Sequence, residues 1–145
     1  MQTFLPWPDF GRSANCLDRL RLGKQRVETL QILKTLATDH GSGAWANHPA
    51  VRMWKGHELV LIQYGQAICG QWTDRGYQDS CAEKISKYKS WFKNRTSPKW
   101  LGNDDFHLAH RSNLLRKFPQ HYTQFFEPGL KPDLSYIWPT QMKEA

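Results

Sequence analysis

The longest helical pattern in the chain is PAVRMWKGHELVLIQYGQAICGQWTDR, which runs from Pro49 to Arg75. Proline is common in the first turn of a helix, and a glycine, here Gly76, often follows the last turn. Side chains suited to a buried face recur every three or four residues, with Glu58 as the exception. That face comprises Val51, Trp54, Glu58, Leu61, Gly65, Ile68 and Trp72. The sequence therefore predicts one long core helix over residues 49–75.

Three further helices are predicted on either side of this one. Ser13 or Asn15 can cap the first of them, and Asp104 or Asp105 can cap the last, since these short polar side chains favour the N-cap. Gly23 lies inside the first helix, where it permits a close approach to the backbone. The three helices are expected over residues 13–37, 78–92 and 104–118.

The two ends of the chain have the composition of irregular structure. Residues 1–12 contain two prolines and a glycine, which predicts an extended arm. Residues 127–139 follow an aromatic turn and contain three prolines and a glycine, which predicts an irregular strap. The alternation typical of strands is absent. We expect an all-α fold: residues 1–145 form one compact domain of three to four main helices, with an extended N-terminal arm and an irregular aromatic C-terminal strap.

The charge balance favours a polyanionic partner. The chain has 20 Lys plus Arg and 13 Asp plus Glu, which gives a net charge of +7, and its pI is near 9.5. Seven Trp, seven Phe and five Tyr accompany this charge, and some alternate with lysine, as in residues 87–93. Aromatic rings among cations can stack on bases. We therefore expect nucleic acid as the partner, although at least half of the aromatic residues should fill the core.

The cysteines and the hydropathy pattern point to the cytoplasm. Cys16, Cys69 and Cys81 are scattered, odd in number and without CxxC spacing, which indicates free thiols in a reducing compartment. The N-terminus lacks the pattern of a signal peptide, and no apolar run reaches 18 residues. We expect a cytoplasmic protein that does not enter a membrane.

Four polar residues of the first helix can form a site. Because they are spaced i, i+3, i+4 and i+7, they lie within roughly a third of the helix circumference. A carboxylate beside a guanidinium, an amine and an amide can bind a phosphate or sugar and transfer a proton. The alternative is a solvated helix face with an ordinary i,i+4 ion pair. The four residues are Arg21, Lys24, Gln25 and Glu28, and Arg19 and Arg26 flank them.

The last predicted helix carries histidines and cations that could contact phosphate. His107, His110 and Arg111 share one face, whereas Asn113, Arg116 and Lys117 form another. Two histidines at i,i+3 could ligate a metal, but a third ligand with motif spacing is missing, so we expect no metal. The alternative is an ordinary polar helix in which a buried His110 pairs with Glu58.

No common nucleophile or nucleotide motif is present. The chain lacks Ser-His-Asp and Cys-His signatures, the Walker loop and GxGxxG. The remaining catalytic candidates are carboxylates, amines and histidines. An amine that attacks C1′ of a sugar, with a carboxylate to move protons, can break an N-glycosidic bond. This chemistry needs no cofactor.

The order of these features resembles the phage pyrimidine-dimer glycosylase family, the endonuclease V type of excision enzyme. The chain is most similar to a bacterial and phage branch of that family, and the similarity covers nearly the whole chain. The segments that carry it are Thr3–Phe10, Leu22–Glu28, Asn47–Val51, Met53–Gly56, Arg111–Lys117 and Tyr136–Pro139.

The resemblance implies a compact three-helix fold, a kinked duplex with a flipped nucleotide, and no metal. It also implies an N-terminal α-amine as nucleophile and a glutamate on the first long helix, which maps best onto Glu28. In the characterised enzymes removal of the initiator methionine exposes a small residue, whereas Gln2 here is large enough to prevent removal. The nucleophile is therefore the Met1 amine or Lys24, or this branch has no lyase activity.

We accordingly expect a monomeric DNA N-glycosylase with AP-lyase activity that acts on pyrimidine dimers or modified pyrimidines in double-stranded DNA. Glu28 would be the acid/base, Met1 or Lys24 the nucleophile, and Trp54 or Trp7 would fill the gap left by the flipped base. The alternatives are a non-catalytic nucleic-acid-binding module and an enzyme of free nucleotides or nucleosides. The expected DNA contacts are Arg19, Arg21, Gln25, Arg26, His48, Trp54, Lys55, His107, His110, Arg111, Asn113, Arg116 and Lys117.

Overall fold

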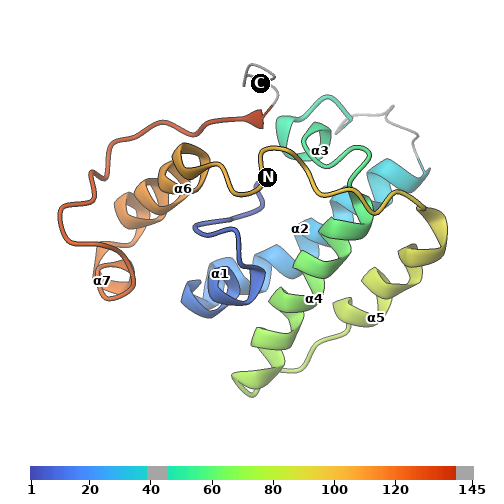
Figure 1. The fold of residues 1–145 in the computed structure, drawn as a ribbon. Coiled ribbons are helices and arrows are strands. Elements are labelled where there is room, and N and C mark those ends of the chain that lie inside the picture. The colour runs from blue at the N-terminus through green and yellow to red at the C-terminus, as the bar shows by residue number, and fades with distance from the viewer. Residues whose placement is uncertain (39–45, 140–145) are drawn as a thin grey trace.

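The computed structural model describes residues 1–38 and 46–139 (Figure 1). Those residues form seven α-helices and one 3₁₀ helix and contain no strand, which confirms the all-α prediction. No helix in these two ranges is long and apolar enough to span a membrane. The elements are α1 (Phe10–Cys16), α2 (Arg19–Thr38), α3 (Pro49–Arg52), α4 (Glu58–Asp74), α5 (Cys81–Ser86), η1 (Lys87–Trp91), α6 (Asp104–Lys117) and α7 (Pro119–Tyr122).

The two longest helices, α2 and α4, pack against each other at the centre of the fold, with α5 and α6 on opposite sides of the pair (Figure 1). Gly65 of α4 lies at a close crossing. A Cβ atom there would be 2.8 Å from Cγ2 of Thr29 in α2 and 3.1 Å from Cδ1 of Ile85 in α5. A similar approach occurs at Gly23, where the neighbour is the ring of Trp72, 3.1 Å from a built Cβ. Both glycines therefore serve helix packing.

The predicted helix over residues 13–37 begins earlier and is divided. Asp9 caps α1, since its Oδ1 accepts a hydrogen bond from Arg12 N at 2.8 Å. The backbone becomes extended at Leu17, and Asp18 then accepts a hydrogen bond from Arg21 N at 3.3 Å at the start of α2. Because Asp18 can cap a second helix, the interruption between α1 and α2 is locally favourable. The extended arm is consequently residues 1–9.

The prediction of one helix over residues 49–75 was wrong. The helix α3 lasts one turn, and the chain then passes through Gly56, whose φ of 86° lies in the left-handed region. Glycine adopts that region without a Cβ clash, so the segment can reverse before α4 begins. Glu58 accepts a hydrogen bond from Gly56 N at 3.0 Å, which gives this buried carboxylate a backbone partner.

The remaining helices follow the prediction in part. The segment expected as a helix over 78–92 contains only α5, which continues into the 3₁₀ helix η1. Asp79 accepts hydrogen bonds from the backbone N–H groups of Cys81 and Ala82 and so caps α5. The helix predicted over 104–118 is confirmed as α6, but its N-cap is Asn103, and the predicted caps Asp104 and Asp105 lie in its first turn. Cys16, Cys69 and Cys81 are free and buried.

The N-terminal arm is extended, as predicted, but it is buried between α6 and the pair formed by α2 and α4 (Figure 1). Buried backbone groups need hydrogen-bond partners, and side chains of three helices supply them. Gln25 of α2 accepts from Phe4 N at 2.9 Å, and Tyr64 of α4 donates to Phe4 O at 2.8 Å. His110 of α6 accepts from Leu5 N at 3.0 Å. The arm thus serves as a central layer of the core.

The C-terminal strap, residues 127–139, runs along α6 without regular structure, as predicted. The side chains of α6 hold its backbone. Ser112 Oγ accepts a hydrogen bond from Leu134 N at 3.0 Å, and Asn113 donates one to Leu134 O at 3.0 Å. Arg116 donates one to Pro132 O at 3.0 Å. One side of α6 therefore binds the arm, and another binds the strap.

Candidate active site

A cavity of about 360 Å³ lies where the arm begins, between α2 and α6. It combines one carboxylate with cations from two helices and with the first residues of the chain. Three of the four polar residues predicted to share a face of α2 line it. The lining residues are Met1, Gln2, Phe4, Leu20, Arg21, Lys24, Glu28 and Lys117.

Glu28 is bonded directly to the start of the arm. Its Oε2 accepts hydrogen bonds from Gln2 N at 3.3 Å and from Gln25 Nε2 at 2.9 Å. The terminal amine of Met1 is therefore one residue away from the group that binds the carboxylate. This contact joins two groups that the sequence placed 26 residues apart.

Gln25 determines how the arm lies on α2. Its side chain is fully buried, and its Nε2 also donates to Gln2 O at 2.7 Å. Its Oε1 accepts from Phe4 N at 2.9 Å and lies 2.5 Å from the hydroxyl oxygen of Tyr64, whose single proton is shared between Gln25 Oε1 and Phe4 O. All of these partners belong to the protein. Gln25 thus positions the chain start beside Glu28 and does not line the cavity, although it belongs to the predicted polar set.

His48 is close enough to this centre for its charge state to depend on it. Burial lowers the pKa of His48, the positive terminal amine lowers it further, and the charge of Glu28 opposes this. Its Nδ1 accepts a hydrogen bond from Ala50 N at 3.0 Å, which caps α3, and its ring packs on Trp138. The charges of the Met1 amine and the Glu28 carboxylate therefore both act on the imidazole of His48.

Lys117 brings an amine from α6 to the cavity. Its Nζ donates a hydrogen bond to the hydroxyl of Tyr136 at 3.1 Å and lies 5.3 Å from the centre of the Phe4 ring. Partial burial lowers the pKa of Lys117, and the positive charges of Arg21 and Arg116 add to this effect, whereas Glu28 opposes it. The cavity therefore has excess positive charge, which suits a phosphate group.

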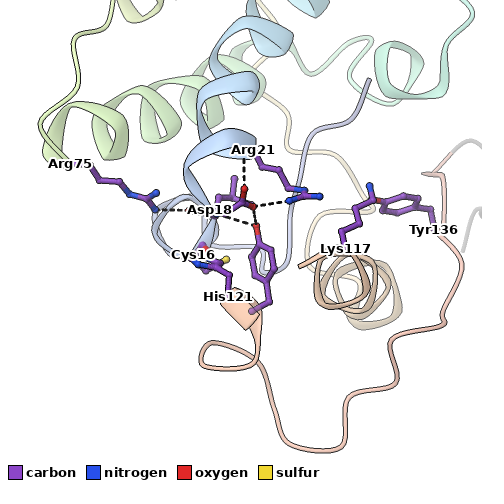
Figure 2. A network of polar contacts seen from close by, with 9 residues as sticks. Cys16, Asp18, Arg21, Arg75, Lys117, His121 and Tyr136 are labelled. Atoms are coloured by element: carbon purple, nitrogen blue, oxygen red, sulfur yellow. Dashed lines mark hydrogen bonds and ion pairs between the residues drawn. The ribbon is translucent and has the colours of Figure 1, made fainter. Parts of the chain in front are cut away.

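Asp18 orients Arg21 toward this cavity (Figure 2). Its Oδ1 is 3.1 Å from Nη1 of Arg21 and also accepts a hydrogen bond from the hydroxyl of Tyr122. Burial alone would raise the pKa of Asp18, but the hydrogen bonds from Tyr122 and Arg21 and the charge of Arg21 lower it overall. Figure 2 shows the Arg21 guanidinium extending from Asp18 toward Lys117.

The junction that holds Asp18 is itself fixed from two sides. Arg75, just after α4, donates a hydrogen bond to Leu17 O at 2.7 Å, and His121 of α7 is bonded to Cys16 O at 2.8 Å. Elements from the middle and the end of the chain therefore position the start of α2. Asp18 was not among the residues predicted from the sequence, although the preference of aspartate for the N-cap of a helix was an available signal.

Several residues predicted to contact DNA are buried and bind other parts of the protein. His110 accepts from Leu5 N, and His107 is bonded through Nδ1 to Leu5 O at 2.7 Å. Burial lowers the pKa of His110 to about 3, so its ring is neutral. The alternative in which His110 pairs with Glu58 is wrong, because His110 binds Leu5 N and Glu58 binds Gly56 N. The buried residues in this set are Gln25, Trp54, His107, His110 and Asn113.

Trp54 is fully enclosed, and its Nε1 donates to Thr3 Oγ1 at 3.1 Å, so its ring is not at the surface to fill a gap in DNA. Trp7 is partly exposed and stacks edge-on against Phe126. It lines a separate hollow of about 490 Å³, which also contains Arg12 and Arg111. The apolar spacing around Trp54 already favoured burial, whereas Trp7 belongs to the predicted arm, for which no periodic pattern indicated exposure.

The other predicted cations lie outside the cavity. Arg26 pairs with Asp79 at 2.6 Å and stacks on Trp72, whereas Arg19 and Lys55 are exposed. Arg111 donates to Pro6 O at 2.7 Å and pairs with Glu127 at 3.0 Å, and Arg116 holds the strap. The side chains of Arg26, Arg111 and Arg116 therefore order neighbouring segments. Within the described ranges, no three His, Cys, Asp or Glu side chains are grouped as metal ligands.

Two aromatic residues of the cavity region were not predicted as site residues. Phe4 supplies an apolar wall, and Tyr136 of the strap accepts the hydrogen bond from Lys117. Burial raises the pKa of Tyr136 to about 12, against the charges of Arg116 and Arg21, so it stays a neutral phenol. No local pattern indicated either residue, since both reach the site only through the irregular ends of the chain.

A comparison with protein families matches residues 1–84 to a family described as pyrimidine dimer DNA glycosylase. The match covers more than half of the chain and includes the arm, Glu28 and His48. The helix α6, with Lys117, lies outside the matched residues. The comparisons with curated proteins and with solved structures found no match.

Proposed function

The chain belongs to the pyrimidine dimer DNA glycosylase family, and we propose that it excises a damaged or modified pyrimidine from double-stranded DNA, with N-glycosylase and AP-lyase activity. The observation that carries this proposal is the hydrogen bond from Gln2 N to Glu28 Oε2. The bond holds the second residue of the chain on the carboxylate, and Met1, which lines the same cavity, carries the terminal amine one residue away. An amine and a carboxylate are the pair of groups that the proposed reaction requires.

In the first step the neutral amine of Met1 attacks C1′ of the deoxyribose. The N-glycosidic bond breaks, its electron pair leaves with the base, and the base takes up a proton. The bond between C1′ and O4′ then breaks, O4′ takes up the second proton of the amine nitrogen, and a Schiff base between that nitrogen and C1′ remains. Glu28 is placed to transfer protons in this step because it accepts hydrogen bonds at the chain start.

In the second step Glu28 removes a proton from C2′ of the Schiff base. The electron pair forms a C1′–C2′ enamine, and its collapse breaks the bond between C3′ and oxygen, so that the 3′ phosphate leaves. Water then hydrolyses the remaining imine and restores the amine. Glu28 lines the cavity beside Arg21 and Lys24, which supports this role.

We favour the Met1 amine over Lys24 as the nucleophile. An α-amine is a weaker base than a lysine side chain by roughly two and a half pKa units, so it is far more often neutral near pH 7. Met1 is also partly buried at the cavity, whereas the Lys24 side chain is exposed. Lys24, Arg21 and Lys117 then bind the phosphates on either side of the reacting sugar.

Borohydride reduction in the presence of an abasic duplex tests the nucleophile. A Schiff base becomes a stable covalent adduct, and mass spectrometry of the digested protein identifies its peptide. We expect the adduct on the Met1 peptide, both in the wild type and in Lys24→Ala. An adduct on the Lys24 peptide would reassign the nucleophile, and no adduct at all would remove the lyase step.

The same assay separates the alternative functions. A non-catalytic DNA-binding module would bind DNA with a steep salt dependence and yield no adduct. An enzyme of free nucleosides would release bases from nucleosides as readily as from duplexes. Release of free base from a panel of duplexes, each with one dimer or modified pyrimidine, then identifies the substrate.

A further inference from the structure

Residues 81–99 hold most of the net charge of the protein, and none of them lines the Glu28 cavity. The segment has six Lys and Arg residues and one acidic residue, Glu83, which gives 6 − 1 = +5 of the total of +7. All six cationic side chains are exposed. Within residues 1–38 and 46–139 none of them forms an ion pair. The six are Lys84, Lys87, Lys89, Lys93, Arg95 and Lys99.

A groove of about 710 Å³ lies between this segment and α4. Its volume is within the range of about 300–1,000 Å³ common for ligand pockets. One wall is apolar and amide-bearing, and the other combines an aromatic ring with three cations. The lining residues are Leu59, Val60, Ile62, Gln63 and Gln66 of α4, and Lys89, Phe92, Lys93 and Arg95.

Trp91, at the end of η1 and directly before this basic wall, is 59% exposed. Burying an indole ring is strongly favourable, so a tryptophan left this open among cations offers a surface on which another flat group can stack. Its nearest aromatic neighbour is Tyr88, at 6.1 Å between ring centres. The groove and this ring together are called the η1 surface below.

The η1 surface and the Glu28 cavity lie on different sides of the molecule. Arg26 and Glu28 are two residues apart on α2 and therefore point about 200° apart around the helix. Glu28 faces the arm, whereas Arg26 pairs with Asp79, just before α5. Figure 1 likewise places α5 and α6 on opposite sides of α2 and α4. The two sites therefore face different directions.

We propose that the η1 surface binds single-stranded DNA independently of the Glu28 site. Its exposed cations are complementary to a phosphate backbone, and its open ring and partly apolar groove can receive unstacked bases. In a duplex the bases are paired and stacked, so Trp91 and the apolar wall would have no partner there. The combination of features therefore favours a single strand over a duplex.

Fluorescence anisotropy with the full chain tests this proposal. The probes are a labelled oligothymidine of about 16 nucleotides, the upper range for one single-strand site, and an undamaged duplex of equal length. Each is titrated at several salt concentrations. The variants are Trp91→Ala and the double variant Lys89→Ala with Lys93→Ala. The control, Lys34→Ala with Lys131→Ala, removes the same charge from exposed positions elsewhere.

We expect Trp91→Ala to weaken oligothymidine binding about tenfold, with duplex binding unchanged. The Lys89 and Lys93 double variant should reduce the salt slope for oligothymidine by about 1.4, since each phosphate contact on a single strand contributes about 0.7. The control variant should match the wild type. Far-UV circular dichroism establishes that each variant is folded.

The result is independent of the proposed excision activity. Glu28→Gln should bind oligothymidine like the wild type, and the double lysine variant should still cleave an abasic duplex. The proposal is overturned if Trp91→Ala binds oligothymidine normally or weakens both probes alike. It is also overturned if the control pair changes the slope as much as Lys89 and Lys93 do, because the effect would then reflect net charge.

Discussion

At the scale of single residues, the position of Glu28 leads to a direct prediction. The change Glu28→Gln is nearly isosteric and keeps an oxygen that can accept the hydrogen bond from Gln2 N, but it cannot transfer protons. We expect base release to fall by about 10²–10⁴-fold, as when a general acid/base is lost. Affinity for DNA should stay within a few-fold, because removing a negative charge does not weaken phosphate binding.

Single-turnover base release and DNA affinity, measured on the same preparation, check this prediction. Lys34→Ala is a suitable control, since Lys34 is an exposed residue on the same helix. Wild-type base release by Glu28→Gln would mean that another group is the acid/base.

Two neighbouring cations of α6, Arg116 and Lys117, should contribute differently to DNA binding, although both were predicted to contact DNA. Lys117 lines the Glu28 cavity, whereas the Arg116 guanidinium donates to the carbonyls of Pro132 and Leu134 in the strap. We expect Lys117→Ala to lower the magnitude of the salt slope for duplex binding by about 0.9, the value for one phosphate contact. Arg116→Ala should leave the slope unchanged.

Affinity measured between low and moderate salt gives these slopes. Because Arg116 holds the strap, its variant should instead lower stability, by about 0.5–1.5 kcal/mol for a lost hydrogen bond. If Arg116→Ala and Lys117→Ala changed the salt slope equally, both side chains would contact DNA phosphates, and the expected difference between them would be wrong.

At the scale of elements, the crossing of α2, α4 and α5 depends on Gly65. A Cβ atom there would overlap Thr29 and crowd Ile85, both of which belong to other helices. We expect Gly65→Ala to destabilise the protein by about 1–3 kcal/mol, the usual cost of overpacking. Urea unfolding measures the change.

The same helix provides a matched control at Gly70. A Cβ atom there meets nothing within 4 Å. Gly70→Ala should therefore stabilise the protein by up to about 1 kcal/mol, because alanine is the better helix former. If both alanine variants were stabilising, the packing at Gly65 would be looser than the structure indicates.

The sequence predicted elements best where local signals suffice. The helix α6 has an uninterrupted pattern, and its bounds were predicted within a residue, although its N-cap is Asn103 and not Asp104 or Asp105. The helix predicted over 49–75 failed because α3 ends at Arg52 and the chain then passes through the left-handed residue Gly56, which was not one of the residues of the buried pattern. The apolar residues keep a spacing of three or four across the loop between α3 and α4, so periodicity could not indicate where the helix is interrupted.

The candidate site divides in the same way. Glu28, Lys24 and Arg21 could be placed on one face of a helix from spacing alone, and Lys117 from its cationic helix. The burial of Trp54 agrees with its place in the apolar spacing, whereas the burial of Gln25 could not be predicted, because the arm that covers it is distant in sequence. Polar residues on a helix look alike whether they bind a ligand or a buried segment of backbone.

At the scale of the whole molecule, the arm couples the site to global stability. Residues 2–6 are buried, and their backbone is bonded to α2, α4 and α6. Loosening any of these helices would release the chain start from Glu28. Conditions that weaken the arm should therefore reduce excision activity and stability together, and acid is such a condition because His110 holds Leu5.

The folded state keeps His110 neutral, since burial lowers its pKa to about 3, and the charges of His107 and Lys117 act in the same direction. In the unfolded chain a histidine has a pKa near 6.5. The unfolded state therefore binds more protons between these two values. The contribution of His110 to stability is complete above about pH 6.5 and declines as the pH falls toward 3. At pH 5 the loss from this residue is about 2 kcal/mol.

His110→Gln isolates this effect, because the glutamine oxygen can accept the hydrogen bond from Leu5 N without titrating. Urea unfolding at pH 7 and pH 5 gives the free energy of unfolding of both proteins. The wild type should lose about 2 kcal/mol more than the variant between the two pH values. The value at pH 7 shows whether the variant folds and how well glutamine replaces the imidazole. Equal losses in both proteins would mean that His110 is not the buried neutral group through which acid acts on the arm.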